Sequence, residues 1–190
     1  MAGAQFAEAA FEDAPGEPLV SGWNAIEAAL CRVAAMQAAW CAGAAARLLQ
    51  DTVTYVSERH QFGVPIGSFQ AVQHRLADCD IEVAEAEALA RNAAELLGDD
   101  APQARRLAST AFVRAGEAFV AVSRSCHQVW GGMGYCTEAN VHLFSRRAKV
   151  AQMSWGGPEY HLDVIAEELR AIPLLRDRYA TALHRRGIEL

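Results

Sequence analysis

The stretch YVSERHQFGVPIGSFQ, residues 55–70, separates two long helical patterns and decides where the chain turns back on itself. From Trp23 to about Glu58 apolar residues recur at helical spacing without a proline, which predicts one helix of roughly 35 residues. Gly63 and Pro65 break that pattern. A second apolar stripe runs from about residue 68 to 97, so the stretch predicts a tight reversal between two long helices.

Further breaks divide the rest of the chain into helices. The segment Gly98–Pro102 ends the second pattern, and a third helix is predicted at about residues 102–129. Shorter helices are predicted at about 138–144, 159–171 and 173–186, and no stretch alternates for long enough to predict a strand. Three long helices with short connections indicate an all-α fold, an antiparallel up-down helical bundle with shorter helices in a fourth position.

Composition is consistent with one helical domain. The chain has 190 residues, of which 52% are hydrophobic, and about a fifth are alanine, the best helix former. Residues 1–20 carry prolines and little periodicity, so we expect an irregular N-terminal arm there and the bundle domain over residues 21–190. A net charge of −6 argues against binding to nucleic acid, which requires a basic face.

Several classes of site and location are not supported by the sequence. The five cysteines form no CxxC pair, and the six histidines lack the spacing of a metal site, so no metal is expected. Reduced thiols and the lack of a signal-peptide pattern favour a cytoplasmic protein. The apolar stretch 25–46 contains Glu27, Arg32 and Gln37, which favours a buried core helix over a membrane span. We therefore expect no membrane partner.

A glycine-rich loop follows the third predicted helix. Taken alone, VWGGMGY at 129–135 is typical of a helix end that turns a corner, because it lacks the spacing of a dinucleotide or phosphate loop. The longer string QVWGGMGYCTE at 128–138 resembles the pattern Q-x-x-G-G-x-G-[YF]-x-x-E, and RRAK at 146–149 resembles R-[DE]-A-[KR]. Together with residues 55–70, these strings are similar to the C-terminal domain of the acyl-CoA dehydrogenases. The resemblance covers about residues 10–170.

The resemblance implies a helical bundle that binds FAD across a subunit interface. It therefore implies a homo- or hetero-oligomer, acting on acyl-CoA in fatty acid metabolism. Arg59 matches an arginine that contacts the pyrophosphate, and arginine suits that task because it offers fixed donors to phosphate oxygens. The alternative for Arg59 is a surface side chain that is solvated or paired with Glu58. The matched cofactor-binding positions are Arg59, Gln61, Phe62, Gln70, Gln128, Gly131 and Gly132.

One position departs from the family pattern where the chemistry would occur. Family members carry a catalytic glutamate nine residues after the arginine of the R-[DE]-A-[KR] motif, and here that count from Arg146 ends at Trp155. An indole cannot accept a proton, so no catalytic residue is predicted at that place. The next motif residue, a threonine that contacts flavin, is Gly157. The alternative glutamate position in the first helix falls near Val33, and Glu159 is the nearest substitute base.

Two smaller departures accompany this change. Arg32 is displaced from the family's arginine in the first helix, and Arg147 replaces the acid of the R-[DE]-A-[KR] motif. Family members also have N-terminal and middle domains before the bundle, and here only residues 5–13 are expected as a remnant of the middle domain.

Two functions remain open on the sequence alone. The chain is a partial or non-catalytic subunit that shares FAD with a partner, such as a full-length acyl-CoA dehydrogenase subunit, or it is a helical assembly module that binds no flavin.

Overall fold

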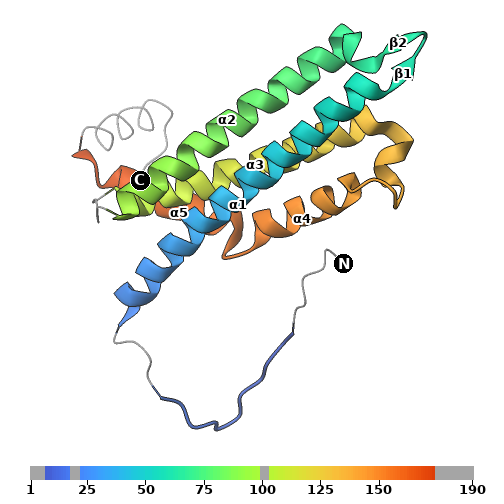
Figure 1. The fold of residues 1–190 in the computed structure, drawn as a ribbon. Helices are drawn as coiled ribbons and strands as arrows, with labels where there is room; N and C mark the ends of the chain where they lie inside the picture. The colour runs from blue at the N-terminus through green and yellow to red at the C-terminus, as the bar shows by residue number, and fades with distance from the viewer. Residues whose placement is uncertain (1–6, 18–21, 99–102, 174–190) are drawn as a thin grey trace, which may run out of the picture.

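The structure, a computed structural model, describes residues 7–17, 22–98 and 103–173. Within them the fold is all-α, as predicted, with one two-stranded hairpin (Figure 1). The helices are α1 (Trp23–Glu58), α2 (Gln70–Gly98), α3 (Ala104–Trp130), α4 (Val141–Met153) and α5 (Gly157–Arg170). Two 3₁₀ turns are η1 (Ile66–Ser68) and η2 (Gly131–Tyr135), and the hairpin strands are β1 (His60–Gln61) and β2 (Val64–Pro65).

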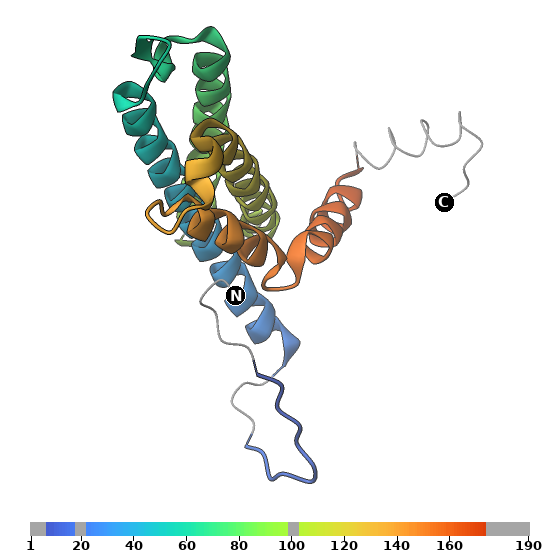
Figure 2. The same cartoon turned by 90° about the vertical axis from the view of Figure 1, so that its right-hand side faces the viewer.

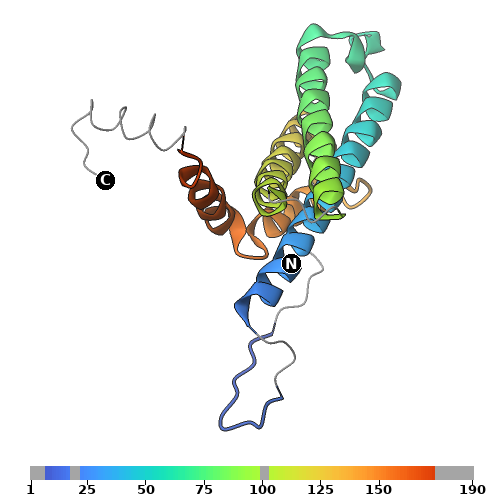
Figure 3. The ribbon, with the colours of Figure 1, turned by 90° about the vertical axis from the view of Figure 1, so that its left-hand side faces the viewer.

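The long helices form the expected up-down bundle. In Figure 1, α1 and α3 run in the same direction, α2 runs beside them in the opposite direction, and α4 returns along α3. The predicted fourth position is therefore occupied by α4. Helix α5 packs on α3 and then points away from the bundle, as Figures 2 and 3 both show. The hairpin, η2 and the C-terminal ends of α1 and α3 consequently lie at one end of the bundle (Figure 1).

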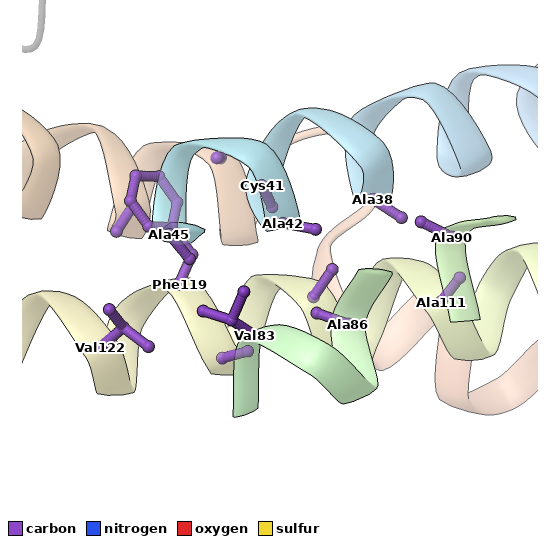
Figure 4. Packing of buried hydrophobic residues seen from close by; sticks show 14 of the residues in the cluster. Ala38, Cys41, Ala42, Ala45, Val83, Ala86, Ala90, Ala111, Phe119 and Val122 are labelled. Carbon is purple, nitrogen blue, oxygen red and sulfur yellow. The ribbon is translucent and has the colours of Figure 1, made fainter. Parts of the chain in front are cut away.

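Small side chains bring the three long helices close together. Figure 4 shows alanines of α1, α2 and α3 packed around larger residues such as Val83 and Phe119. Phe119 on α3 is fully buried, and its ring meets Trp40 and Phe144 edge-on at centroid distances of 5.8 and 6.5 Å. Alanine loses no rotamer freedom on burial, so an alanine-rich seam is an inexpensive way to pack long helices.

Helix α1 is buried over only part of its length. Its buried residues begin at Ala34 and end at Val56, while the turns before them are mostly exposed. The helix is long and apolar enough to cross a membrane by length and composition, but 33% of its most apolar window is already buried in the bundle. The prediction of a buried core helix therefore holds for its C-terminal part. The aromatic side chain of Trp40 and its helical spacing predict a core position, and this prediction is wrong in detail because Trp40 is 44% exposed.

Other expectations have mixed outcomes. The first helix begins and ends where it was predicted, but α4 begins later than expected and extends to Met153, so the RRAK segment is helical. The helix predicted at 173–186 lies almost entirely outside the described residues. Residues 7–17 contain no helix or strand, and the domain division stays a prediction. All five cysteines are unpaired, and Cys41, Cys79 and Cys126 are buried.

Candidate functional site

The turn between α1 and α2 is a hairpin with a strained tip. The backbone φ angles of Phe62 and Gly63 are +54° and +83°, as a two-residue reversal requires, and Gln61 pairs with Val64 across it. Phenylalanine rarely adopts a positive φ, and its side chain is 94% exposed here. The sequence predicted the reversal but not the strands, because two residues per strand give no alternating pattern.

The hairpin is fixed to the bundle by close contacts. A Cβ atom on Gly67 would lie 3.1 Å from the carbonyl oxygen of Val56, so the bare backbone lets η1 pack directly on α1. Ser68 Oγ donates to the carbonyl of Pro65 at 2.7 Å, and Gln73 Nε2 donates to that of Gly67 at 3.0 Å. These contacts hold the hairpin at a defined angle at the start of α2.

A stacked aromatic pair joins this hairpin to the glycine-rich loop. The rings of Tyr55 on α1 and Trp130 on α3 are parallel within 9°, with centroids 3.9 Å apart. Trp130 Nε1 donates to the buried Thr52 Oγ1 at 3.0 Å, and that hydroxyl donates to the carbonyl of Leu48 at 2.8 Å. Two sequence motifs about seventy residues apart are thereby held side by side. No local sequence pattern indicated this stack.

The glycine-rich loop leaves its backbone open at two positions and closed at a third. Gly131 has φ of +58°, and a Cβ atom on Gly131 or Gly132 would meet nothing within 4 Å. A Cβ on Gly134 would instead lie 3.0 Å from His127 Nδ1 and 3.2 Å from Trp130 Cβ. Gly134 therefore lets η2 fold onto the end of α3, while the first two glycines expose backbone to an approaching ligand.

The predicted cofactor-binding residues gather at this end of the bundle. All seven are exposed. They lie on the hairpin, at the start of α2, and at the junction of α3 with η2: Arg59, Gln61, Phe62, Gln70, Gln128, Gly131 and Gly132. Within the described residues Arg59 forms no ion pair with Glu58 or another carboxylate, while Gln61 Nε2 donates to the carbonyl of His60 at 2.7 Å. Their roles in cofactor binding stay predictions.

A cleft opens beside these residues and suits a phosphorylated ligand. It has a volume of about 470 Å³, and Gln128 and Gly131 lie on its wall together with Arg124 and Lys149. An arginine, a lysine, an amide and uncovered glycine backbone are groups that bind phosphates and polar ring edges. The residues present therefore fit the nucleotide half of a cofactor such as FAD. Among the described residues no group of three His, Cys, Asp or Glu side chains could hold a metal.

The turn between α4 and α5, which contains the position matched to the catalytic base, carries no proton acceptor at that position. Trp155 lies in the turn between α4 and α5 with φ of +54°, and its side chain is 54% exposed. Gly156 and Gly157 follow with φ of +95° and +68°, and a Cβ on Gly156 would lie 3.0 Å from Tyr160. Glu159 is exposed in the first turn of α5, where a negative carboxylate interacts favourably with the positive end of the helix dipole. This explains Glu159 without a catalytic role.

A buried histidine, not singled out by the sequence, anchors α5 to α3. His161 is 2% exposed, its Nδ1 lies 3.1 Å from Ser109 Oγ, and its ring stacks on Phe112 at 4.0 Å. Burial lowers the pKa of His161, because the charged imidazolium would lose its hydration. Its Nε2 has no partner among the described residues. The sequence offered no signal for this contact beyond the helical spacing of α5.

Comparison with known proteins gives a consistent result. The profile of the family described as "Acyl-CoA dehydrogenase, C-terminal domain" matches residues 20–170. The acyl-CoA dehydrogenase IpdE2 of Mycolicibacterium smegmatis is 36% identical over 136 residues, which cover 72% of this chain and 42% of that protein.

Two solved structures have a similar fold. Butyryl-CoA dehydrogenase from Megasphaera elsdenii aligns with a TM-score of 0.73 and 31% identity over 76% of this chain and 38% of its own. The ChsE4–ChsE5 complex from Mycobacterium tuberculosis aligns with a TM-score of 0.71 and 34% identity over 76% and 39%. The chain thus spans less than half the length of these relatives.

Proposed function

The chain belongs to the acyl-CoA dehydrogenase family through the C-terminal domain of that family, and from this premise we propose that it binds the ADP half of FAD at a subunit interface without supplying the catalytic base. The observation that carries the proposal is the meeting of the hairpin and the glycine-rich loop at one end of the bundle, joined by the stack of Tyr55 on Trp130.

Each residue has a defined part in this proposal. The exposed Arg59 guanidinium donates to pyrophosphate oxygens, and the side-chain amides of Gln70 and Gln128 bind polar edges of the nucleotide. Gly131 and Gly132 let the ligand approach the backbone, since nothing lies within 4 Å of a Cβ atom there. When bound, FAD supplies the hydride acceptor for dehydrogenation of an acyl-CoA thioester.

A partner is proposed for the chemistry that this chain lacks. Trp155 cannot remove a proton, so a second subunit of the acyl-CoA dehydrogenase type would provide the base and the remaining cofactor contacts. The relative named as the ChsE4–ChsE5 complex supports this idea, because its name describes an assembly of two different chains. The exposed Trp40 and Met36 on α1, 44% and 72% exposed, give such an assembly apolar surface to cover. A cytoplasmic location is proposed with it.

A second function has its own support. The exposed Trp155 and the glycine at position 157 remove both a base and a hydroxyl from the turn between α4 and α5. A helical assembly module that binds no flavin would need neither group. In that case the hairpin serves only to join two helices.

Purification from the native cells under mild conditions separates the two functions. The first predicts that the tagged chain elutes in a complex larger than 190 residues can account for, together with flavin absorbance and a partner of the acyl-CoA dehydrogenase family. A colourless assembly of this chain alone would favour the second function and contradict the first. Partner identity by mass spectrometry and flavin content by absorbance are measured on the same fractions.

A further inference from the structure

The cleft between α3 and α4 carries a feature that cofactor binding at the hairpin does not explain. One wall is the last three turns of α3, the other is α4, and η2 closes one end. Its polar side chains are Ser123, Arg124 and His127 on α3 and Ser145 and Lys149 on α4. None of these five is among the residues that match the family's cofactor contacts. These five side chains therefore add two cations and three further polar groups to a cleft that Gln128 and Gly131 also line.

The floor of the cleft holds an unsatisfied donor. Ser123 is 2% exposed and lines the cleft, yet its Oγ has no hydrogen-bond partner among the described residues. A buried hydroxyl without a partner is uncommon in folded proteins and calls for an explanation. A ligand atom in the cleft that accepts a hydrogen bond would satisfy it.

The histidine beside this serine is held neutral and in place. His127 Nε2 lies 2.6 Å from Ser145 Oγ, and its ring packs on Tyr135 with centroids 4.8 Å apart. Burial, followed by the charge of nearby His142, lowers the pKa of His127. His127 therefore shapes the wall between α3 and η2, and the positive charge of the cleft comes from other residues.

Two cations without acidic partners flank the cleft. Within the described part of the chain neither Arg124 nor Lys149 has a carboxylate within ion-pair distance, and Lys149 Nζ donates to Gln152 Oε1 at 2.7 Å. Both residues line the same cleft, so their two positive charges act on the same volume. A guanidinium, an ammonium and a hydroxyl donor together are suited to phosphoryl oxygens.

We propose that this cleft binds the phosphoryl group of a small anion, with Arg124 and Lys149 contacting its oxygens and Ser123 Oγ donating from the floor. The volume of about 470 Å³ admits a ligand larger than a single phosphate. The phosphoryl group could belong to a free phosphorylated metabolite or to the nucleotide half of a flavin that reaches across Gln128 and Gly131. Both sources use the same three contacts, and a parallel titration with FAD distinguishes them.

Titration calorimetry of inorganic pyrophosphate into the full-length chain tests the site. Saturable binding is expected, and Arg124→Gln and Lys149→Gln should each weaken it about tenfold or more, the scale of one charge-assisted hydrogen bond. Arg75→Gln, which removes an exposed arginine on α2, should leave it unchanged. No saturable heat at millimolar pyrophosphate, or equal losses in all three variants, would overturn the proposal.

Further measurements test the role of Ser123 and identify the source of the phosphoryl group. Ser123→Ala should weaken pyrophosphate binding severalfold without lowering the melting temperature of the ligand-free chain, because it removes a hydroxyl that has no partner. If Ser123→Ala leaves binding unchanged, the floor of the cleft is not part of a site. Titration with FAD in place of pyrophosphate separates the two sources: FAD binding should weaken about tenfold in Arg124→Gln if the flavin uses the cleft, and should not depend on Arg124 if only a free metabolite uses it. Loss of pyrophosphate binding in Arg59→Ala alone would place the anion at the hairpin and overturn the proposed cleft site.

Discussion

The two ends of α3 differ in how closely the nearby residues match the functional positions of the family. At its C-terminal end, Tyr55 and Trp130 bring the hairpin and the glycine-rich loop together, and every predicted cofactor-binding side chain is exposed. Its N-terminal half packs against α5 through Ser109 and His161, after a turn that holds Trp155 where a base was expected. The residues matched to cofactor binding and the position matched to the catalytic base thus lie in separate parts of the bundle.

The glycines in these two regions also differ in their surroundings. The C-terminal end relies on glycines that open space, since Gly131 and Gly132 have nothing near a Cβ position. In the turn at Trp155, glycine at position 156 avoids a collision, because a Cβ atom there would lie 3.0 Å from Tyr160. Trp155 itself is held at φ of +54°, a conformation that bulky residues rarely adopt. The first set of glycines leaves open space beside the backbone, while the second lies in a turn with a collision at one of its two positions.

The largest expected effect concerns catalysis at Trp155. The purified chain with added FAD, an acyl-CoA and an electron-acceptor dye should show no turnover above the dye background, because a positioned base contributes roughly 10²–10⁴-fold in rate. Dye reduction measures this directly. Turnover that Glu159→Gln abolishes and Glu167→Gln preserves would show that the exposed Glu159 acts as the base and that the two ends are not separate.

The next largest expected effect is on stability, at Gly134 in the glycine-rich loop, where a side chain has no room. Gly134→Ala should lower the free energy of unfolding by about 1–3 kcal/mol, since the new methyl group would press on His127 and Trp130. Gly132→Ala in the same loop is the matched control and should change it little. Urea denaturation followed by tryptophan fluorescence measures both. Equal stability of the two variants would contradict the packing of η2 on α3.

Acidification should lower the free energy of unfolding through His161, which anchors α5 to α3. Because burial lowers the pKa of His161 in the folded state, the unfolded chain binds more protons, and stability decreases as the pH decreases below about 6.5, the pKa of an unperturbed histidine. The decrease attributable to one histidine is no steeper than about 1.4 kcal/mol per pH unit.

His161→Gln should flatten this dependence, while His74→Gln, at an exposed position on α2, should not. Urea midpoints measured from pH 7.5 to pH 5 on the three proteins check the effect. An unchanged slope in His161→Gln would show that another group controls the acid response.

The smallest effects concern two exposed glycines of opposite expected sign. Gly63→Ala should destabilise the chain by about 1 kcal/mol, because the hairpin tip needs φ of +83°. Gly43→Ala, in the interior of α1 with open space around it, should stabilise by roughly 0.5–1 kcal/mol. Thermal melts of the two variants compare them. A shift of the same sign in both would contradict the assigned turn.

These expectations show what the sequence could and could not predict. The bounds of α1 followed from apolar spacing between Trp23 and Glu58, and the reversal from Gly63 and Pro65. The extent of α4 was underestimated because its second half, with Arg146 and Arg147, carries little apolar periodicity. Trp40 was expected in the core, since spacing shows which face of a helix is apolar and not how fully a neighbour covers it.

For the candidate site, local motifs indicated single residues but not their neighbours. Arg59 and Gln128 were recognisable in their own strings, whereas the stack of Tyr55 on Trp130 that joins them depends on the packing of α1 against α3. The sequence likewise did not indicate that Arg124 and Lys149 line one cleft, because that cleft forms only when α4 packs back along α3. Contacts between distant helices are set by tertiary packing, which one-dimensional patterns do not record.

Flavin content of the native complex, measured in matched variants, tests the separation of the two ends most directly. Arg59→Ala should weaken flavin retention by about 1.5–3 kcal/mol, the scale of a hydrogen bond to a charged group, and lower the FAD-to-protein ratio. Trp155→Ala and the control Arg91→Ala, at an exposed position on α2, should leave that ratio unchanged. An unchanged ratio in Arg59→Ala, or a loss confined to Trp155→Ala, would contradict the account.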